Sequence, residues 1–206
     1  MKRKIWCLLL IPLLLAAVYY FAPRVVPAEQ FGFAYEIPES EAAQRQKLVD
    51  TAVSWAGVHE DDGSHHFIID LYNTITPLPL NYRVTYDDAW CAACVSAAAL
   101  ASGMTDILPP ECSCSRQIQL FEELGRWEEN DGCRPLPGDV IYYDWDFSRS
   151  YECTDPPEHV GIVVGTYGPL IRVVEGNMAD GFSGFRIIWQ NDWCIRGYGL
   201  PDYASK

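Results

Sequence analysis

The chain has 206 residues, of which 49% are hydrophobic and 13% aromatic. That is enough for one sizeable core but short for two catalytic domains, so we expect a single folded domain. The formal charge is −13 at pH 7, and no basic cluster follows the first four residues. Phosphate binding needs Lys and Arg to release counterions, so this composition excludes nucleic acid from the expected partners.

The N-terminus reads as an export segment, because Lys2-Arg3-Lys4 precedes an apolar run from Ile5 to Ala22. A run of about 18 residues falls between secretory h-regions of about 7–15 and membrane spans of about 17–25. Val26-Pro27-Ala28 supplies small residues for signal peptidase. We expect residues 1–28 to be a signal peptide or a membrane anchor. The positive-inside rule places the rest outside the cytoplasm.

Residues 29–40 are rich in Pro and Glu without a helical period, which predicts a linker before a domain over residues 41–206. Hydrophobic residues then recur at helical spacing until a glycine, which predicts a first helix ending near Ala56. The residues of this pattern are Leu48, Ala52, Trp55, Ala56 and Gly57. A shorter helix is expected over Phe67–Tyr72, followed by a Pro-rich loop at residues 76–80.

The stretch from Asp87 to Gly103 is small and apolar on nearly every face, which predicts a buried helix. Asp87 or Asp88 can cap its start, and Gly103 can end it. Cys91 falls in the first turn. There the unpaired N–H groups and the positive end of the helix dipole stabilise a thiolate and lower its pKa, although most free cysteines are simply small buried hydrophobes.

The second half of the chain predicts an antiparallel sheet after the helices, which is the α+β class. Alternating or continuous apolar segments are separated by turn residues in this half. The expected strands are Asp139–Trp145, Glu158–Val164, Leu170–Glu175, Phe185–Trp189 and Ile195–Tyr198. A histidine, His159, opens one of these strands, and Glu175-Gly176-Asn177 ends the next.

Cysteine hydrolases need a base within hydrogen-bond reach of the sulfur and a third group that orients the imidazole. Cys91, His159 and the pair Glu175 and Asn177 occur in an order that can supply these groups. Each of these residues alone is more often an ordinary structural residue. Their combination makes them the candidate catalytic set.

Four segments carry a resemblance to the CHAP domains, which are cysteine, histidine-dependent amidohydrolases/peptidases related to NlpC-type hydrolases and to papain. The segments are Ala89–Ser96, Leu136–Tyr143, His159–Val163 and Val174–Asn177. The match spans roughly residues 47–203, though only these blocks are distinctive. The resemblance implies a papain-like fold with N-terminal helices packed on an antiparallel sheet.

By that resemblance Cys91 is the nucleophile, His159 the general base and then acid, Glu175 the residue that orients the imidazole, and Asn177 an auxiliary polar group. The family usually has a bulky residue where Cys94 stands. An oxyanion would be held by the Cys91 backbone N–H and a side-chain donor, for which Tyr86 is the candidate.

The substrate that the resemblance implies is bacterial peptidoglycan, cleaved either between muramic acid and L-alanine or within the peptide stem and cross-bridge. The expected location is the bacterial cell envelope, anchored in the membrane or secreted. We expect no cofactor, no metal ion and a monomer.

Two other functions fit parts of the pattern. Trp90-Cys91-Ala92-Ala93-Cys94 is also typical of a thioredoxin-like thiol-disulfide oxidoreductase. Such folds place this motif just after a core strand, and Arg83–Asp88 offers only a poor one. That interpretation also gives His159 and Glu175 no role. The third hypothesis is a non-catalytic wall-binding or scaffold domain, against which the intact nucleophile and base argue.

The remaining cysteines leave several pairings open, since an exported domain permits disulfides. Cys112 or Cys114 could pair with Cys133, and these three could instead hold zinc, although Cys-x-Cys is not the usual ligand spacing. The pairing of Cys94, Cys153 and Cys194 is equally open. His65-His66 is expected to be a solvated loop.

Overall fold

The computed structural model describes residues 18–19, 26–129, 132–145, 157–179 and 181–206. The expected signal peptide or anchor over residues 1–28 therefore lies almost entirely outside the described residues, as does Cys153. Among the described residues, no helix is long and apolar enough to cross a membrane.

The described chain contains both expected classes of element in the expected order, so the α+β class is confirmed. The helices are α2 (Glu39–Val53), α3 (His66–Tyr72), α4 (Cys91–Ser102) and α5 (Cys114–Glu123). The strands are β1 (Trp127–Glu128), β2 (Val140–Tyr143), β3 (His159–Tyr167), β4 (Leu170–Met178), β5 (Phe182–Trp189) and β6 (Ile195–Gly199). Short 3-10 turns occur at Ala28–Gln30, Pro79–Asn81 and Tyr203–Ser205.

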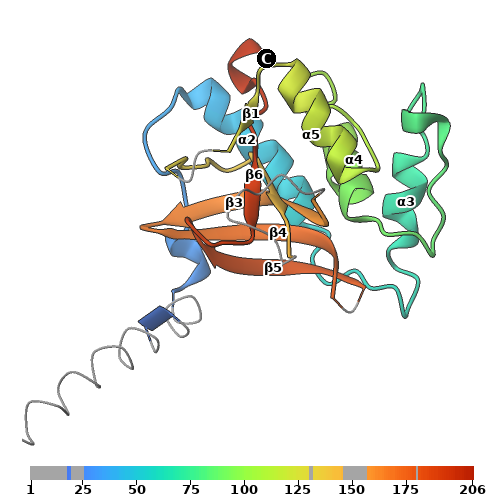
Figure 1. The fold of residues 1–206 in the computed structure, drawn as a ribbon, viewed down its shortest axis with the longest axis horizontal. Helices are drawn as coiled ribbons and strands as arrows, with labels where there is room; N and C mark the ends of the chain where they lie inside the picture. The colour runs from blue at the N-terminus through green and yellow to red at the C-terminus, as the bar shows by residue number, and fades with distance from the viewer. Residues whose placement is uncertain (1–17, 20–25, 130–131, 146–156, 180) are drawn as a thin grey trace, which may run out of the picture.

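The six strands form one antiparallel sheet in the order β1-β6-β2-β3-β4-β5. In Figure 1 helices α2, α4 and α5 lie above strands β3, β4 and β5, and α3 lies beyond α4. Because side chains alternate along a strand, the sheet buries residues on both faces. Val140, Val160 and Val174 join the cluster under the helices, whereas Ile141 and Val173 join a second cluster on the other face.

Helix α4 is the centre of the helical layer and is buried on almost every side, as its composition predicts. It packs against α2 and α3 and against strands β3 and β4. Gly103 ends it in the left-handed region, at φ 73°, a conformation that glycine adopts without steric cost. The small Ala side chains let α4 pack closely against β3 and β4. This packing brings the start of α4 to the start of β3.

The prediction that Asp87 or Asp88 caps the start of α4 is wrong. Trp90 occupies the N-cap position and gives no side-chain cap. The Asp88 carboxylate instead accepts hydrogen bonds from Thr85 and from the Tyr82 hydroxyl, which closes a turn three residues upstream. The first-turn N–H groups of α4 are therefore left without a side-chain cap, and the Ala92 N–H hydrogen-bonds to the Cys91 sulfur.

Three further expectations need correction. Helix α2 ends at Val53 rather than Ala56, because residues 54–57 form a turn instead. A helical face was expected at Glu122-Glu123 and a loop at Glu128-Glu129, but the bounds of α5 and the short strand β1 were not predicted. His65 is 3% exposed rather than solvated, since its ring packs near Trp90 and its Nε2 contacts the Tyr86 carbonyl.

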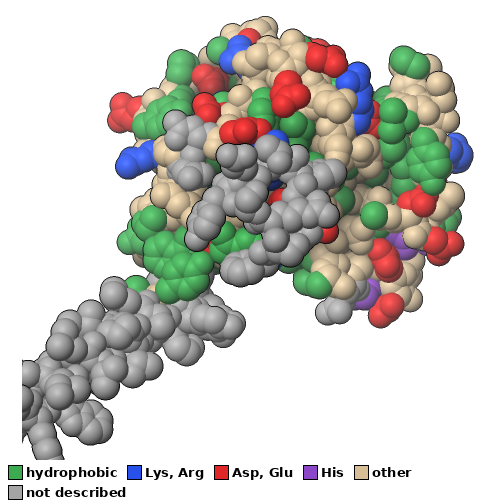
Figure 2. All heavy atoms as spheres, in the orientation of Figure 1, with side chains coloured by type: hydrophobic (Ala, Val, Ile, Leu, Met, Phe, Trp, Pro, Cys, Tyr) green, Lys and Arg blue, Asp and Glu red, His purple; other side chains and the backbone are tan. Residues whose placement is uncertain are grey.

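The face drawn in Figure 2 carries scattered Asp and Glu side chains and few Lys or Arg side chains. This distribution agrees with the formal charge of −13. Acidic groups repel phosphate, which agrees with the expectation drawn from the net charge.

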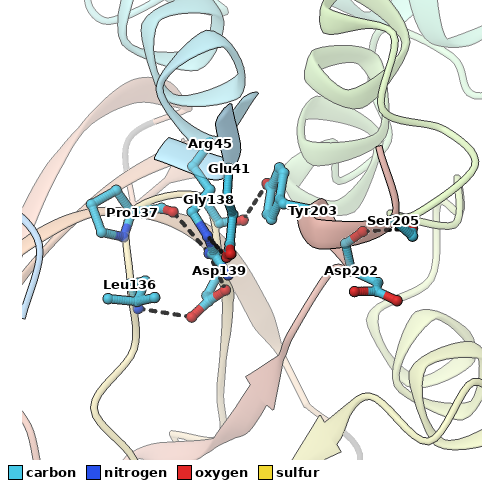
Figure 3. Close-up of polar contacts among 9 residues, drawn as sticks. All are labelled: Glu41, Arg45, Leu136, Pro137, Gly138, Asp139, Asp202, Tyr203 and Ser205. Atoms are coloured by element: carbon cyan, nitrogen blue, oxygen red, sulfur yellow. Dashed lines mark hydrogen bonds and ion pairs between the residues drawn. The ribbon is translucent and has the colours of Figure 1, made fainter. Parts of the chain in front are cut away.

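A buried polar cluster ties α2 to the turn that leads into β2 (Figure 3). The Arg45 guanidinium donates to Asp139 Oδ1 at 2.7 Å and to the Pro137 carbonyl at 3.1 Å. The Tyr203 hydroxyl donates to the Gly138 carbonyl at 2.8 Å, which adds the C-terminal segment. Because β2 pairs with β3, this cluster holds the strand from which His159 projects.

We predict that Arg45→Met lowers the free energy of unfolding by about 3 kcal/mol, because it leaves the Asp139 carboxylate buried without its partner. Urea denaturation followed by circular dichroism measures the loss. Gln46→Met is the matched control, since the Gln46 side chain bonds to Asp50 on the exposed side of α2. Equal stability of the two variants would contradict the assigned role of Arg45.

Candidate active site

Cys91 is the first residue of α4 and is 6% exposed. Its sulfur lies 3.8 Å from the sulfur of Cys114, the first residue of α5. The Ala92 N–H hydrogen-bonds to the Cys91 sulfur from the same helical turn. The nucleophile predicted from the sequence therefore lies where two helices begin, beside N–H and S–H donors.

These surroundings lower the pKa of Cys91 well below its usual value near 9. The largest cause is the hydrogen bond from Cys114. Burial opposes it, and the hydrogen bond and charge of His159 add to it. These hydrogen bonds outweigh burial and favour the thiolate, which is the nucleophilic form of the sulfur.

His159 opens β3, and Glu175 lies on the neighbouring strand β4. The imidazole Nε2 lies 3.1 Å from Glu175 Oε2, which leaves Nδ1 as the nitrogen available to the Cys91 sulfur. Gly161 stands opposite Glu175 in the strand pairing, two residues after His159. A Cβ at Gly161 would come within 2.7 Å of Glu175 Cγ, so glycine gives the carboxylate its path to the histidine.

Arg186 on β5 completes the set and was not predicted from the sequence. Its Nε donates to Glu175 Oε1 at 2.7 Å, and its Nη2 donates to Oε2 at 2.9 Å. Burial alone would raise the pKa of Glu175, which is 1% exposed, but the hydrogen bonds from His159 and Arg186 outweigh burial and lower it. Glu175 is therefore ionised, with a cation on each side.

The pKa of His159 is raised to about 9. Burial opposes the rise, and the hydrogen bonds and charges of Cys91 and Glu175 outweigh it. Below this pH the histidine is an imidazolium beside the Cys91 thiolate. Such an ion pair can attack a carbonyl carbon through sulfur and then donate a proton to a leaving group.

Asn177 contacts the residue at the start of α4. With its amide turned to satisfy both neighbours, its oxygen accepts from the Trp90 N–H at 3.0 Å and its nitrogen donates to Glu60 Oε1 at 3.1 Å. The same Glu60 oxygen accepts from the Trp90 indole at 2.7 Å. Asn177 therefore fixes the residue that precedes Cys91, which is a positioning role.

Tyr86, the predicted oxyanion donor, is 43% exposed. Its hydroxyl donates to Asp70 Oδ1 at 2.9 Å, and its ring stacks on His66 at 3.8 Å between centroids. In this arrangement the Tyr86 hydroxyl donates to a residue of α3, and its role as an oxyanion donor stays a prediction.

The described cysteines are all free. Cys112, Cys114 and Cys133 belong to three different hydrophobic clusters, so neither a Cys133 disulfide with the other two nor a shared zinc site describes this structure. Within the described ranges, no group of three His, Cys, Asp or Glu side chains is arranged to hold a metal ion. Cys94 packs against the sheet at Gly176, and burial raises its pKa to about 12.

Cys114 and Arg186 are the site residues that sequence reasoning missed. Apolar or buried residues recur at Cys114, Ile118 and Phe121 after Ser113, whose hydroxyl caps the helix, and this spacing is the signal for α5. No comparable signal identifies Arg186, because its contact with Glu175 depends on the pairing register of β4 and β5.

No protein-family model matches the sequence, and neither does any curated protein. Two solved structures align with the fold: the crystal structure of Ly7917 and that of Ly7917 with the hydrolyzing product of MDP. Each has a TM-score of 0.44 and 12% sequence identity. The alignment covers 76% of this chain and 62% of the Ly7917 chain.

We predict that Glu175→Gln lowers the pKa of His159 by about one to two pH units, since a neighbouring opposite charge is worth that much. An NMR titration of the His159 ring signals, assigned with His159→Ala, measures the change. Glu158→Gln is the matched control, because Glu158 is exposed and accepts from the Trp145 N–H. The same His159 midpoint in both variants would contradict the pairing with Glu175.

Proposed function

We propose that the protein is an exported peptidoglycan hydrolase that cleaves an amide bond by a Cys-His thiol mechanism. The observation that carries the proposal is the buried chain of contacts in which Glu175 holds the imidazole of His159 beside the Cys91 sulfur. A purely structural histidine would not need a carboxylate on one side and an ionised sulfur on the other. The four sequence blocks that resemble CHAP domains support the choice of substrate.

The first step is attack of the Cys91 thiolate on the amide carbonyl. Negative charge then develops on the carbonyl oxygen, and the backbone N–H of Cys91 is the donor proposed to meet it. No side chain caps the start of α4, so the amides of its first turn are not committed to a carboxylate. Tyr86 could serve as a second donor only after releasing Asp70.

His159 carries the proton through the cycle. As an imidazolium it protonates the leaving amine, which collapses the tetrahedral intermediate to a thioester. The neutral imidazole then takes a proton from water, which attacks the thioester and releases the acyl group. Glu175 keeps the ring oriented in both steps, and Arg186 keeps Glu175 charged.

The bond that is cut is either the link between muramic acid and L-alanine or a peptide bond of the stem or cross-bridge. Both are amides, and the Cys-His chemistry serves either one. An exported location suits this substrate, because the wall lies outside the membrane. The N-terminal segment would hold the enzyme there as an anchor or be removed on export.

The thiol-disulfide oxidoreductase is the second candidate, favoured by the Cys91-x-x-Cys94 spacing. That fold places the motif after a strand in a βαβ unit, whereas Arg83–Asp88 is loop and turn and the described sheet is antiparallel throughout. A non-catalytic wall-binding domain is the third candidate function. The buried ion pair of His159 and Glu175 argues against it, because a buried ion pair costs stability and a binding domain has no reaction that needs one.

We predict that Cys91→Ala abolishes the release of soluble fragments from purified sacculi, because it removes the sulfur on which the proposed thioester forms. Cys94→Ala should retain most activity, since the Cys94 side chain packs against Trp90 and Gly176. Turbidity loss of sacculi measures both rates, with circular dichroism to confirm folding. Mass spectrometry of the new termini separates the amidase from the endopeptidase.

The reverse pattern, with Cys94 essential and Cys91 dispensable, would overturn the assignment of the nucleophile. Intact sacculi together with reduction of insulin disulfides would favour the oxidoreductase.

We further predict that cleavage slows as pH rises through about 9, because His159 loses the proton that it donates to the leaving amine. The pKa of His159 is raised, so the active protonated form is present below that pH and disappears above it. The pH dependence of kcat/KM measures this alkaline limb. A rate that keeps rising above pH 10 would contradict the role of the imidazolium.

A further inference from the structure

Cys114 lowers the pKa of Cys91 through a hydrogen bond but forms no covalent bond in the proposed hydrolysis. The two sulfurs lie 3.8 Å apart and both are free. Cys91 is 6% exposed and Cys114 is 8% exposed. A disulfide bond is about 2.05 Å long, so the two sulfurs are in contact and need to approach further to bond.

The start of α5 is fixed against α4 by buried hydrogen bonds. The Ser96 hydroxyl donates to the Glu111 carbonyl at 2.7 Å and accepts from the Glu111 N–H at 2.8 Å. Gln117 donates to the Pro109 carbonyl at 2.9 Å and accepts from the Tyr142 hydroxyl at 2.9 Å. The closeness of Cys114 to Cys91 is therefore built into the helical layer.

We propose that Cys91 and Cys114 form a reversible disulfide that switches the active site off under oxidising conditions. The proposal rests on the proposed function in one respect, namely that Cys91 is the nucleophile. Cys114 is then the resolving thiol, and a dithiol reductant restores activity.

The chemistry takes two steps with a peroxide as the oxidant. The Cys91 thiolate attacks one oxygen of hydrogen peroxide, which breaks the O–O bond, oxidises the sulfur to a sulfenic acid and releases hydroxide. The Cys114 sulfur then attacks the Cys91 sulfur and forms the S–S bond. The sulfenic hydroxyl and the Cys114 proton leave as water. Two exchanges with a dithiol return both thiols and oxidise the dithiol to its own disulfide.

The electrostatics favour this order of events. The pKa of Cys114 is raised well above its usual value, first by its hydrogen bond to the Cys91 sulfur and then by burial. Oxidation of Cys91 to a neutral sulfenic acid removes the thiolate whose hydrogen bond is the first cause of this rise. Cys114 therefore becomes easier to deprotonate when its attack is required.

Cys94 is the competing partner because of its spacing from Cys91 along the chain. Its side chain, however, lies against β4, where a Cβ on Gly176 would come within 2.7 Å of the Cys94 sulfur. Burial is the larger cause of its raised pKa and is independent of the oxidation state of Cys91, whose charge is the smaller cause. Cys94 is thus the matched control.

The test uses the full-length protein, reduced, desalted and then treated with hydrogen peroxide. Peptide mass spectrometry without reduction identifies the partner of Cys91, and alkylation after dithiothreitol measures the recovered Cys91 thiol. We expect a Cys91–Cys114 crosslink in the wild type and in Cys94→Ala. We expect no Cys91 crosslink in Cys114→Ala, with less recovery because the sulfenic acid is oxidised further to a sulfinic acid.

A crosslink from Cys91 to Cys94 would overturn the proposal, as would a wild type without any Cys91 crosslink. The crosslink map of the wild type stands even if Cys114→Ala fails to fold. The readout is also separate from hydrolysis. If the crosslink forms but the reduced protein does not cleave sacculi, the proposed function is contradicted. If the reduced protein cleaves sacculi but no crosslink forms, only the disulfide switch is contradicted.

Discussion

The buried carboxylate of Glu175 is the group on which the site depends. An ionised carboxylate that is 1% exposed is stable only if it is paired and hydrogen-bonded. Arg186 satisfies it from β5, and His159 satisfies it from β3. The Glu175 carboxylate on β4 thus lies between two cationic side chains, and its contact with His159 holds the imidazole in one orientation. The glycine at position 161 is the steric condition for this contact.

The second constraint is the placement of Cys91 at an uncapped helix start. Asn177 and Glu60 hold Trp90 through its backbone and its indole, which fixes the approach of the chain to α4. The small side chains of α4 let the helix pack closely on the sheet, so its first turn meets the start of β3. A thiolate, an imidazolium and a carboxylate consequently form one line of alternating charge inside the protein.

The sequence predicted well wherever local periodicity decides the structure. The strands that carry His159 and Glu175 and the buried helix that carries Cys91 follow from apolar patterns and turn residues. Contacts set by strand register or by packing between distant helices did not follow, so Arg186 and Cys114 were missed. Asp88 was misassigned for a local reason, because its carboxylate serves the Thr85 turn instead of the helix.

The central claim is that Cys91 is held as a thiolate by its surroundings, and competitive alkylation tests it directly. Burial raises the pKa of Cys94 and Cys133 to about 12, so these thiols react slowly near neutral pH. Brief treatment with iodoacetamide at pH 6, followed by peptide mass spectrometry, should modify Cys91 at least about tenfold faster than either of them, since the thiolate is the reactive form. Modification of Cys91 only above pH 8, or at the same rate as the other two, would contradict the account.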